Sequence, residues 1–353
     1  MSSEKLISAI DLFCGVGGLT YGLERSGIDV RLGVDIDPAC EFPIINNSKA
    51  RFLQADVSSL DPGILIKALG TGVRLLAGCA PCQPFSTYSR SAKQKHGAAA
   101  GGTRNEDWRL IGHLGRMVKA ISPDLIAMEN VAPLAQQGVF QDFLDGLEGY
   151  WVDWKVVECS RIGLPQSRKR LVLLASKLGP ISVPEVAGKP QNVRSVIGNL
   201  PRILAGGQDS VDRLHRASRL SQLNMTRIQH SIPGGSWRDW PEEIRALCHI
   251  RDTGATYPSV YGRMRWDEPA PTITTQCFGY GNGRFGHPEQ DRAISLREAA
   301  MLQGFPQNYK FISDEEPVSF SKVGRLIGNA VPVTLAEVIG GALIRHVKEF
   351  KRR

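Results

Sequence analysis

Short apolar runs alternate with helix-like stretches along the first half of the chain. The apolar runs cover residues 6–13, 30–36, 52–56, 73–78, 124–128, 152–157 and 171–175, and helical spacing appears at 19–26, 64–69, 110–120 and 140–147. Strands of this kind that alternate with covering helices are typical of a doubly wound, mostly parallel sheet. We therefore expect an α/β fold for this part of the chain.

The pattern changes after about residue 177. Three prolines follow in close succession, and the stretch to residue 292 is rich in Arg, Gly, Pro and aromatic residues with little periodicity. An apolar helical pattern returns through residues 331–347, where Pro332 stands as a helix-first proline would. We expect a catalytic lobe built from residues 1–177 plus 325–353, with the last helix packed on it, and a smaller irregular lobe from 178–324.

Composition narrows the class of protein. The 353 residues are 42% hydrophobic and 22% charged, as in an ordinary globular protein, and we find no run of the roughly 18 uncharged apolar residues that a membrane helix needs. The N-terminal sequence lacks the build of a secretory signal, so we expect a cytoplasmic protein without a membrane partner. The formal net charge of +8 is compatible with an anionic partner.

The cysteines do not resemble a disulfide framework, because there are seven of them scattered along a long chain. Cys79 and Cys82 have the CxxC spacing of a redox couple or of half a zinc site. No second CxxC and no paired histidines follow in the sequence. We expect reduced thiols and no metal, and interpret the spacing as incidental.

The first three predicted strands each lead into candidate ligand residues. The first ends at Phe13 and the glycine turn Gly15–Gly18, and Asp35 and Asp56 end the next two. A single such Asp is often only a helix cap. Three such strand ends in order at one sheet edge, one with the glycine turn and two with an Asp, predict a nucleoside pocket, where carboxylates bind a ribose diol and an adenine amine. Thr20 replaces the third glycine of GxGxxG, which disfavours a dinucleotide site.

Later strands end in residues suited to covalent chemistry. The fourth runs into Pro81-Cys82-Gln83-Pro84, in which two prolines bracket a candidate nucleophile. The fifth ends at Glu129-Asn130-Val131, and Gln166-Ser167-Arg168-Lys169-Arg170 follows the sixth.

Six segments together resemble the DNA cytosine-5 methyltransferase family: DLFCGVGG, PCQPFS, ENV, QSRKR, LQGFP and GNAVP. They follow the family's order over nearly the whole chain, and only about residues 177–288 match weakly. The resemblance implies an S-adenosylmethionine-dependent fold with a target-recognition lobe. It also implies transfer of a methyl group to carbon 5 of a cytosine extruded from duplex DNA, with S-adenosylhomocysteine as the product.

The chemistry explains the residue types. Carbon 5 of cytosine is a poor nucleophile until a thiolate adds at carbon 6, and Cys82 is the candidate thiolate. Charge that develops on the ring then needs a donor at N3, for which Glu129 is the candidate. The resemblance implies that Arg170 lies near the cytosine O2 and that Arg168 makes a supporting contact to the backbone or the adduct.

For the methyl donor, the resemblance implies a set of residues from all parts of the catalytic lobe. These are Phe13, Gly15, Gly17, Gly18, Asp35, Ile36, Asp56, Val57, Pro81, Leu110, Asn329 and Val331. Ile36 departs from the family, in which many members carry an aromatic residue, and should give an aliphatic wall.

For DNA, we expect contacts from Gln83, Ser86 and Arg90, in a basic loop that closes over the substrate, and from Arg263, Thr272 and Thr274 in the recognition lobe. A surface role is as good an interpretation of Arg263. We expect a monomer from a restriction-modification or related system, with an endonuclease of the same specificity as a partner that forms no stable complex. Two alternatives stay open: a transfer RNA methyltransferase of the same fold, and a non-catalytic relative that only binds nucleic acid.

Overall fold

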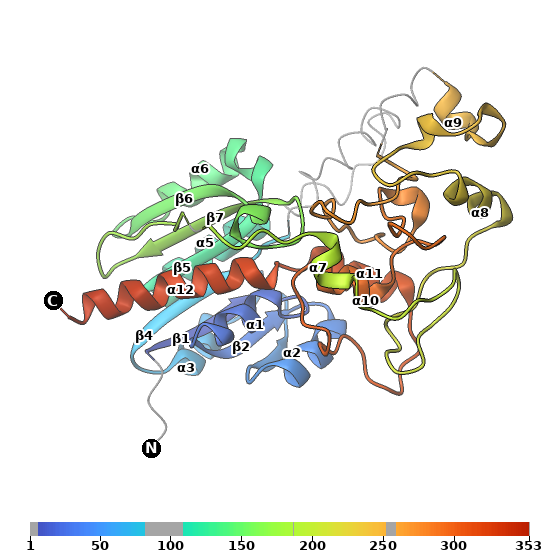
Figure 1. The fold of residues 1–353 in the computed structure, drawn as a ribbon. Helices are drawn as coiled ribbons and strands as arrows, with labels where there is room; N and C mark the ends of the chain where they lie inside the picture. The colour runs from blue at the N-terminus through green and yellow to red at the C-terminus, as the bar shows by residue number, and fades with distance from the viewer. Residues whose placement is uncertain (1–5, 82–108, 186, 252–258, 353) are drawn as a thin grey trace. The chain divides into compact units, whose positions relative to one another are not determined.

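The computed structural model describes residues 6–81, 109–185, 187–251 and 259–352 (Figure 1). The chain forms two compact units. The first comprises Met1–Cys159, Lys169–Val186 and Val331–Arg353, and the second comprises Ser160–Arg168 and Ala187–Ala330. Residues 160–168 and 325–330 therefore belong to the second unit and 178–186 to the first, in contrast to the lobe limits expected from sequence.

The first unit is built on a seven-stranded sheet. The strands are β1 (Ile7–Leu12), β2 (Asp29–Asp35), β3 (Arg51–Gln54), β4 (Val73–Gly78), β5 (Leu125–Val131), β6 (Trp151–Glu158) and β7 (Lys169–Ser176), in the order β3-β2-β1-β4-β5-β7-β6. The first five are mutually parallel, and β7 is antiparallel to β5 and β6. The predicted doubly wound, mostly parallel sheet is confirmed, with all seven strands at the predicted places.

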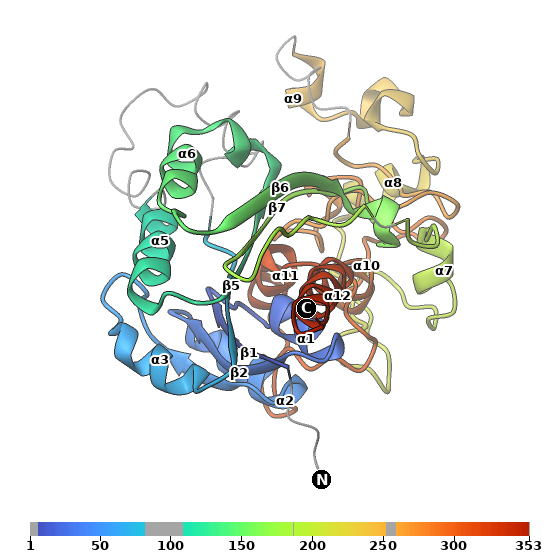
Figure 2. The same cartoon turned by 90° about the vertical axis from the view of Figure 1, so that its left-hand side faces the viewer.

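Helices cover both faces of this sheet (Figure 2). One face carries α3 (Pro62–Leu69), α5 (Arg109–Ile121) and α6 (Gly138–Asp145), which share a buried apolar core with the strands. The other carries α1 (Gly18–Arg25), α2 (Glu41–Asn47) and α12 (Val333–Phe350). Short 3-10 turns occupy Pro38–Cys40, Ala132–Gln136 and Cys159–Ile162.

The expected packing of the last helix on the first lobe is confirmed, and a glycine in α1 allows α1 and α12 to approach each other closely. A Cβ on Gly22 of α1 would lie 2.4 Å from the Cβ of Ala336 in α12. Pro332 caps α12 in an extended conformation and does not occupy its first turn, so that detail of the prediction was wrong.

One stretch of the described chain, Phe320–Phe350, is long and apolar enough to cross a membrane, which the sequence analysis did not anticipate. It comprises α11 (Phe320–Asn329) and α12, and 67% of its most apolar window is buried inside the protein. A buried core helix has the same length and composition, and the packing of α12 accounts for its apolar residues.

The second unit contains short helices and loops, and the described part of it contributes no strand to the sheet. Its helices are α7 (Val193–Ile197), α8 (Gln222–Gln229), α9 (Leu247–Ile250), α10 (Leu296–Leu302) and α11, with 3-10 turns at Trp237–Asp239, Glu242–Ile244 and Tyr280–Asn282. An aromatic cluster of Trp237, Trp240 and Tyr280 packs around Ile228. Trp237 and Trp240 therefore form part of a small core.

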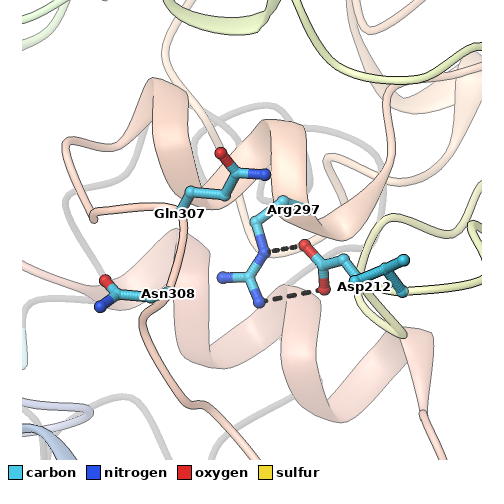
Figure 3. A pocket seen from close by; sticks show the side chains of 5 residues that line it. Asp212, Arg297, Gln307 and Asn308 are labelled. Atoms are coloured by element: carbon cyan, nitrogen blue, oxygen red, sulfur yellow. Dashed lines mark hydrogen bonds and ion pairs between the residues drawn. The ribbon is translucent and has the colours of Figure 1, made fainter.

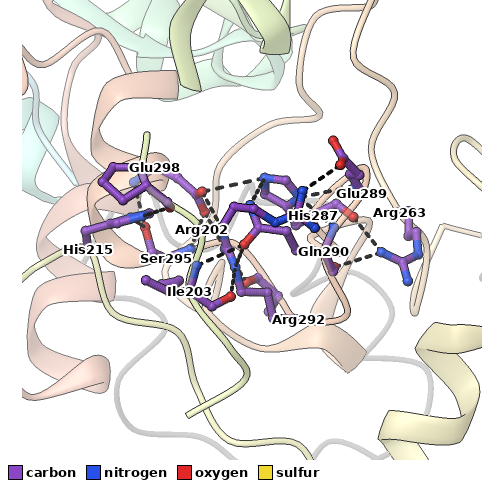
Figure 4. Close-up of polar contacts among 12 residues, drawn as sticks. Arg202, Ile203, His215, Arg263, His287, Glu289, Gln290, Arg292, Ser295 and Glu298 are labelled. Atoms are coloured by element: carbon purple, nitrogen blue, oxygen red, sulfur yellow. Dashed lines mark hydrogen bonds and ion pairs between the residues drawn. The ribbon is translucent and has the colours of Figure 1, made fainter. Parts of the chain in front are cut away.

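A buried polar cluster organises the middle of the second unit (Figure 4). Arg292 donates two hydrogen bonds of 2.7 Å to the carboxylate of Glu298, and both side chains are almost completely buried. Glu298 also closes a capping box with Ser295 at the start of α10. Burial alone would raise the pKa of Glu298, but the hydrogen bonds and charge of Arg292 hold it below its ordinary value.

His287 belongs to the same cluster and accepts hydrogen bonds on its Nδ1 from the backbone N–H groups of Glu289 and Gln290, at 3.1 and 2.9 Å. Burial lowers the pKa of His287 to about 4. A proton on Nδ1 would also face these two donors, so the neutral ring is the form that this site accommodates.

A hollow of about 470 Å³ on the second unit is lined by Val211, Asp212, Arg297, Gln307 and Asn308 (Figure 3). The carboxylate of Asp212 pairs with the guanidinium of Arg297, which also donates 2.9 Å to the carbonyl of Tyr309. The two charges in its wall therefore neutralise each other.

Candidate active site

The turn between β1 and α1 has the backbone shape that a ligand needs. Phe13, Gly15 and Gly17 have φ values of 57°, 52° and 86°, in the left-handed region that favours glycine. A Cβ on Gly15 would meet nothing within 4 Å, so space beside the turn is open. Gly18 is required for a different reason. A Cβ on this residue would lie 2.1 Å from the carbonyl oxygen of Val331, so glycine allows the start of α1 to pack against the backbone at Val331.

Asp35, at the end of β2, is tied to this turn. Its carboxylate accepts hydrogen bonds of 2.9 Å from the backbone N–H groups of Gly15 and Asp37. Burial raises the pKa of Asp35. Each carboxylate oxygen retains a further lone pair for a ligand hydroxyl, and the neighbouring Ile36 is 64% exposed, as an aliphatic wall would be.

Asp56 follows β3 and remains accessible. Its Oδ1 accepts 2.8 Å from the N–H of Ser58, and this hydrogen bond lowers the pKa of Asp56. Val57 is buried, and Arg116 of α5 donates to the carbonyls of Val57 and Ser58 at 2.7 and 3.0 Å. Sequence reasoning missed Arg116 because a helical arginine gives no signal of which loop it anchors.

A buried acid lies at the end of β1. Asp11 is fully buried, which raises its pKa to about 7, and its Oδ2 accepts 2.7 Å from the hydroxyl of Thr20. No hydrogen bond to Oδ1 is present among the described residues. An unsatisfied oxygen beside a glycine turn favours a ligand that brings a cationic or N–H group, so the site fits the aminoacyl part of S-adenosylmethionine.

Four further residues of the predicted pocket have simple placements. Pro81 is exposed and Leu110 is half-buried, both in the first unit, where Val331 is also buried. Asn329 is exposed at the end of α11 in the second unit.

Strand register brings the candidate catalytic acid beside an arginine. Glu129 of β5 is 2% exposed, and Arg170 is paired with Val131, so both side chains lie on one face of the sheet. The Nε of Arg170 lies 2.8 Å from Oε1 of Glu129. Asn130 donates 2.9 Å to the carbonyl of Ala80 and so holds the backbone just before Pro81.

The same register places a residue that sequence reasoning dismissed. The Sγ of Cys79 lies 2.8 Å from Oε2 of Glu129. CxxC spacing drew attention to this cysteine but gave no indication of the carboxylate that it contacts. Cys82, Gln83, Ser86 and Arg90 lie outside the described residues.

The QSRKR segment divides between the units. Lys169 and Arg170 begin β7 in the first, and Gln166–Arg168 belong to the second. There the amide oxygen of Gln166 accepts 3.0 Å from the N–H of Ile273, and Arg168 donates 3.0 Å to the carbonyl of Ile273.

Thr272 and Thr274 flank Ile273, whose backbone is held by these two hydrogen bonds. The hydroxyl of Thr272 donates 2.8 Å to the carbonyl of Ser167, its side chain is exposed, and Thr274 is half-buried.

Arg263, expected to contact DNA, has its guanidinium inside the second unit. The side chain is buried and donates to the carbonyls of Ile228, Ser231, His287 and Gln290 and to the carboxylate of Asp291. In this position Arg263 stabilises the loops of the second unit. Arginine is mostly exposed in proteins, so such burial could not be expected from the residue type.

Among the residues that the structure describes, no group of three or more His, Cys, Asp or Glu side chains is arranged to hold a metal ion.

The sheet order, the strand-end acids and the glycine turn define a Rossmann-like methyltransferase fold, the class of S-adenosylmethionine-dependent enzymes. The model of the family C-5 cytosine-specific DNA methylase matches residues 7–345. The chain therefore belongs to this family and is a DNA cytosine-5 methyltransferase. Membership implies S-adenosylmethionine as the methyl donor and DNA as the substrate.

Named relatives agree with this assignment. The chain is 48% identical to the Type II methylase M.HgiDII of Herpetosiphon aurantiacus, over 98% of this chain and 97% of that protein. It is 30% identical to the Type II methyltransferase M1.HphI of Haemophilus parahaemolyticus, over 96% and 87%.

Solved structures share the fold. A prophage-encoded Escherichia coli protein described as a DNA modification methyltransferase superposes with a TM-score of 0.71 at 22% identity, over 97% of this chain and 99% of that one. The S. pombe Dnmt2 methyltransferase superposes with a TM-score of 0.62 at 16% identity, over 96% and 98%.

Proposed function

We propose that the thiolate of Cys82 adds to carbon 6 of a cytosine extruded from duplex DNA, and that Glu129 supplies the donor to N3. The observation that carries this proposal is the buried Glu129 carboxylate at the end of β5, paired with Arg170. Asn130 anchors the backbone at Ala80, two residues before Cys82. Arg170 bears the positive charge expected near the cytosine O2.

For the methyl donor, the proposed pocket is the edge formed by the ends of β1, β2 and β3. Phe13 and the amides of Gly15 and Gly17 surround the ligand, Asp35 binds the ribose diol, and Asp56 binds the adenine amine. Gly18, Ile36, Val57, Pro81, Leu110, Asn329 and Val331 complete the proposed set. Bound S-adenosylmethionine would supply an electrophilic methyl group, and these residues would hold it.

For the substrate, we assign DNA reading to the segment around Thr272 and Thr274. Gln166 and Arg168 fix its backbone, which supports a defined orientation of the exposed Thr272 side chain. Gln83, Ser86 and Arg90 are proposed to contact DNA beside the nucleophile. The role of Arg263 in recognition is then indirect, through the shape of the unit that it braces.

The biological setting we propose is a Type II restriction-modification system, in which the enzyme acts as a cytoplasmic monomer and a separate endonuclease cuts the same unmodified site. The two named relatives are Type II enzymes, which supports this setting.

Covalent trapping tests the mechanism. Duplex DNA with 5-fluorocytosine at the target position has no proton at carbon 5 to eliminate, so the adduct should persist. With S-adenosylmethionine present, the wild-type protein should form a complex that resists denaturation, and Cys82→Ser should not, although it should still bind the cofactor. Bisulfite sequencing of DNA from expressing cells supplies the target site for the probe.

The matched controls separate the alternatives. Glu129→Gln should form the adduct more slowly, because an amide is a poorer proton source for N3. Trapping of transfer RNA but of no DNA from a varied library would establish the RNA alternative. A protein that binds cofactor yet traps neither substrate would exclude the proposed catalysis.

A further inference from the structure

The thiol of Cys79 lies against the carboxylate on which the proposed chemistry depends. Gly78, the last residue of β4, pairs with Met128 of β5 in parallel register. The residues that follow them in the chain, Cys79 and Glu129, are therefore neighbours on one face of the sheet. The backbone N–H of Cys79 donates 3.3 Å to the carbonyl of Leu12, which fixes the start of this segment against β1. Sγ then lies 2.8 Å from Oε2 of Glu129.

The protonation state of this thiol determines what it can do. Burial, and then the charge of Glu129, raise the pKa of Cys79 well above its ordinary value of 9.0. The group therefore stays an S–H at neutral pH. It is a hydrogen-bond donor and a poor nucleophile.

No second hydrogen bond to this carboxylate is present in the described part of the chain. Arg170 lies 2.8 Å from Oε1 as an ion pair, but Oε1 accepts no hydrogen bond there. An ion pair sets a distance, whereas a directional donor on Oε2 also restricts rotation of the carboxyl plane. The two oxygens are thus held differently, Oε1 by the charge of Arg170 and Oε2 by the thiol donor.

We propose that Cys79 is a positioning residue for the methyl-transfer reaction: its S–H···Oε2 hydrogen bond fixes the plane of the Glu129 carboxyl, which is the proposed donor to N3 of cytosine. The inference rests on the proposed role of Glu129. It gives Cys79 a function unrelated to its CxxC spacing with Cys82.

The test compares donor-free and donor-bearing side chains at one position. Cys79→Val removes the donor and keeps an apolar side chain, and should slow single-turnover methyl transfer roughly tenfold at saturating S-adenosylmethionine and DNA. Dissociation constants for both ligands should stay unchanged. Cys79→Ser restores a donor and should stay within about twofold of the wild-type rate. Cys159→Val makes the same change at another buried cysteine and should leave the rate unchanged.

A double-mutant cycle separates positioning from general structural damage. In a Glu129→Gln background, Cys79→Val should cause no further slowing, because the thiol acts through that carboxylate. If the two factors simply multiply, or if Cys79→Val is as fast as wild type, the inference is overturned. If Cys79→Val does not fold, Cys79→Ala provides the donor-free side chain without crowding.

The two proposals fail in different ways. A wild-type rate for Glu129→Gln would remove the proposed role of Glu129 and this inference with it. A slow Glu129→Gln beside a fast Cys79→Val would overturn the positioning role of Cys79 alone.

Discussion

The buried neutral His287 should make the second unit sensitive to mild acid. Its pKa is lowered from 6.5 to about 4 by burial, with the charges of Glu298, Arg292, Glu289 and Arg263 as further contributions of both signs. Between these two pH values the unfolded chain binds a proton that the folded chain does not. The free energy of unfolding therefore keeps its full value above pH 6.5 and decreases as the pH falls toward 4.

The magnitude follows from the shift. A difference of about 2.5 pKa units corresponds to about 3 kcal/mol over the whole window, of which about 2 kcal/mol should be lost between pH 7.5 and 5.0. His287→Asn should remove this loss, because an Asn side-chain oxygen can accept the same N–H groups of Glu289 and Gln290 without titrating.

Urea unfolding at the two pH values provides the measurement. Tryptophan fluorescence is a suitable probe, since the Trp266 ring packs edge-on against His287 with centroids 5.1 Å apart. Exposed His230→Asn, in the same unit, is the control and should keep the wild-type pH dependence. Equal losses in wild type and His287→Asn, or an NMR titration of His287 centred near 6.5, would refute the reasoning.

Other predictions concern packing and ligands. Gly18→Ala should lower the free energy of unfolding by about 1–3 kcal/mol, since the added Cβ meets the Val331 carbonyl. Gly112→Ala in α5, where the added Cβ has open space, should raise the free energy of unfolding by up to about 1 kcal/mol, as measured by thermal unfolding. Asp35→Ala should weaken S-adenosylmethionine binding more than DNA binding, and unchanged calorimetric affinity for the cofactor would contradict the ribose assignment. DNA affinity should fall steeply with added salt, and a flat response would argue against phosphate contacts.

The sheet could be predicted from sequence because its strands are short apolar runs bounded by turn residues. Strand ends then identified Asp35 and Asp56, since both acids stand at the carboxyl ends of the predicted apolar runs. The α2 helix was missed, because its sequence EFPIINN contains Pro43 and too few residues for a periodic pattern. In the second unit, the buried residues lie in loops and short helices and include Arg263 and Arg292, so hydrophobic periodicity carried little information there.

The candidate site shows a different limit. Glu129 and Arg170 were identified from short motifs, but their contact with each other and with Cys79 depends on how β4, β5 and β7 align. Strand order and register are tertiary properties that no single segment encodes. A thiol three residues from a candidate nucleophile was therefore compared with that nucleophile and not with a carboxylate 50 positions away.

The division of QSRKR between the two units matters for anyone who wishes to change the DNA site by exchanging recognition units between relatives. A graft of residues 187–330 alone would place a foreign copy of the proposed base-reading segment against the host's Gln166 and Arg168, whose hydrogen bonds are formed with the host's own Ile273 backbone. Residues 160–168 should travel with the donor unit, and the junction before Lys169 must leave β7 and its Arg170 intact. Chimaeras built on these borders should keep both halves of the motif with their own partners.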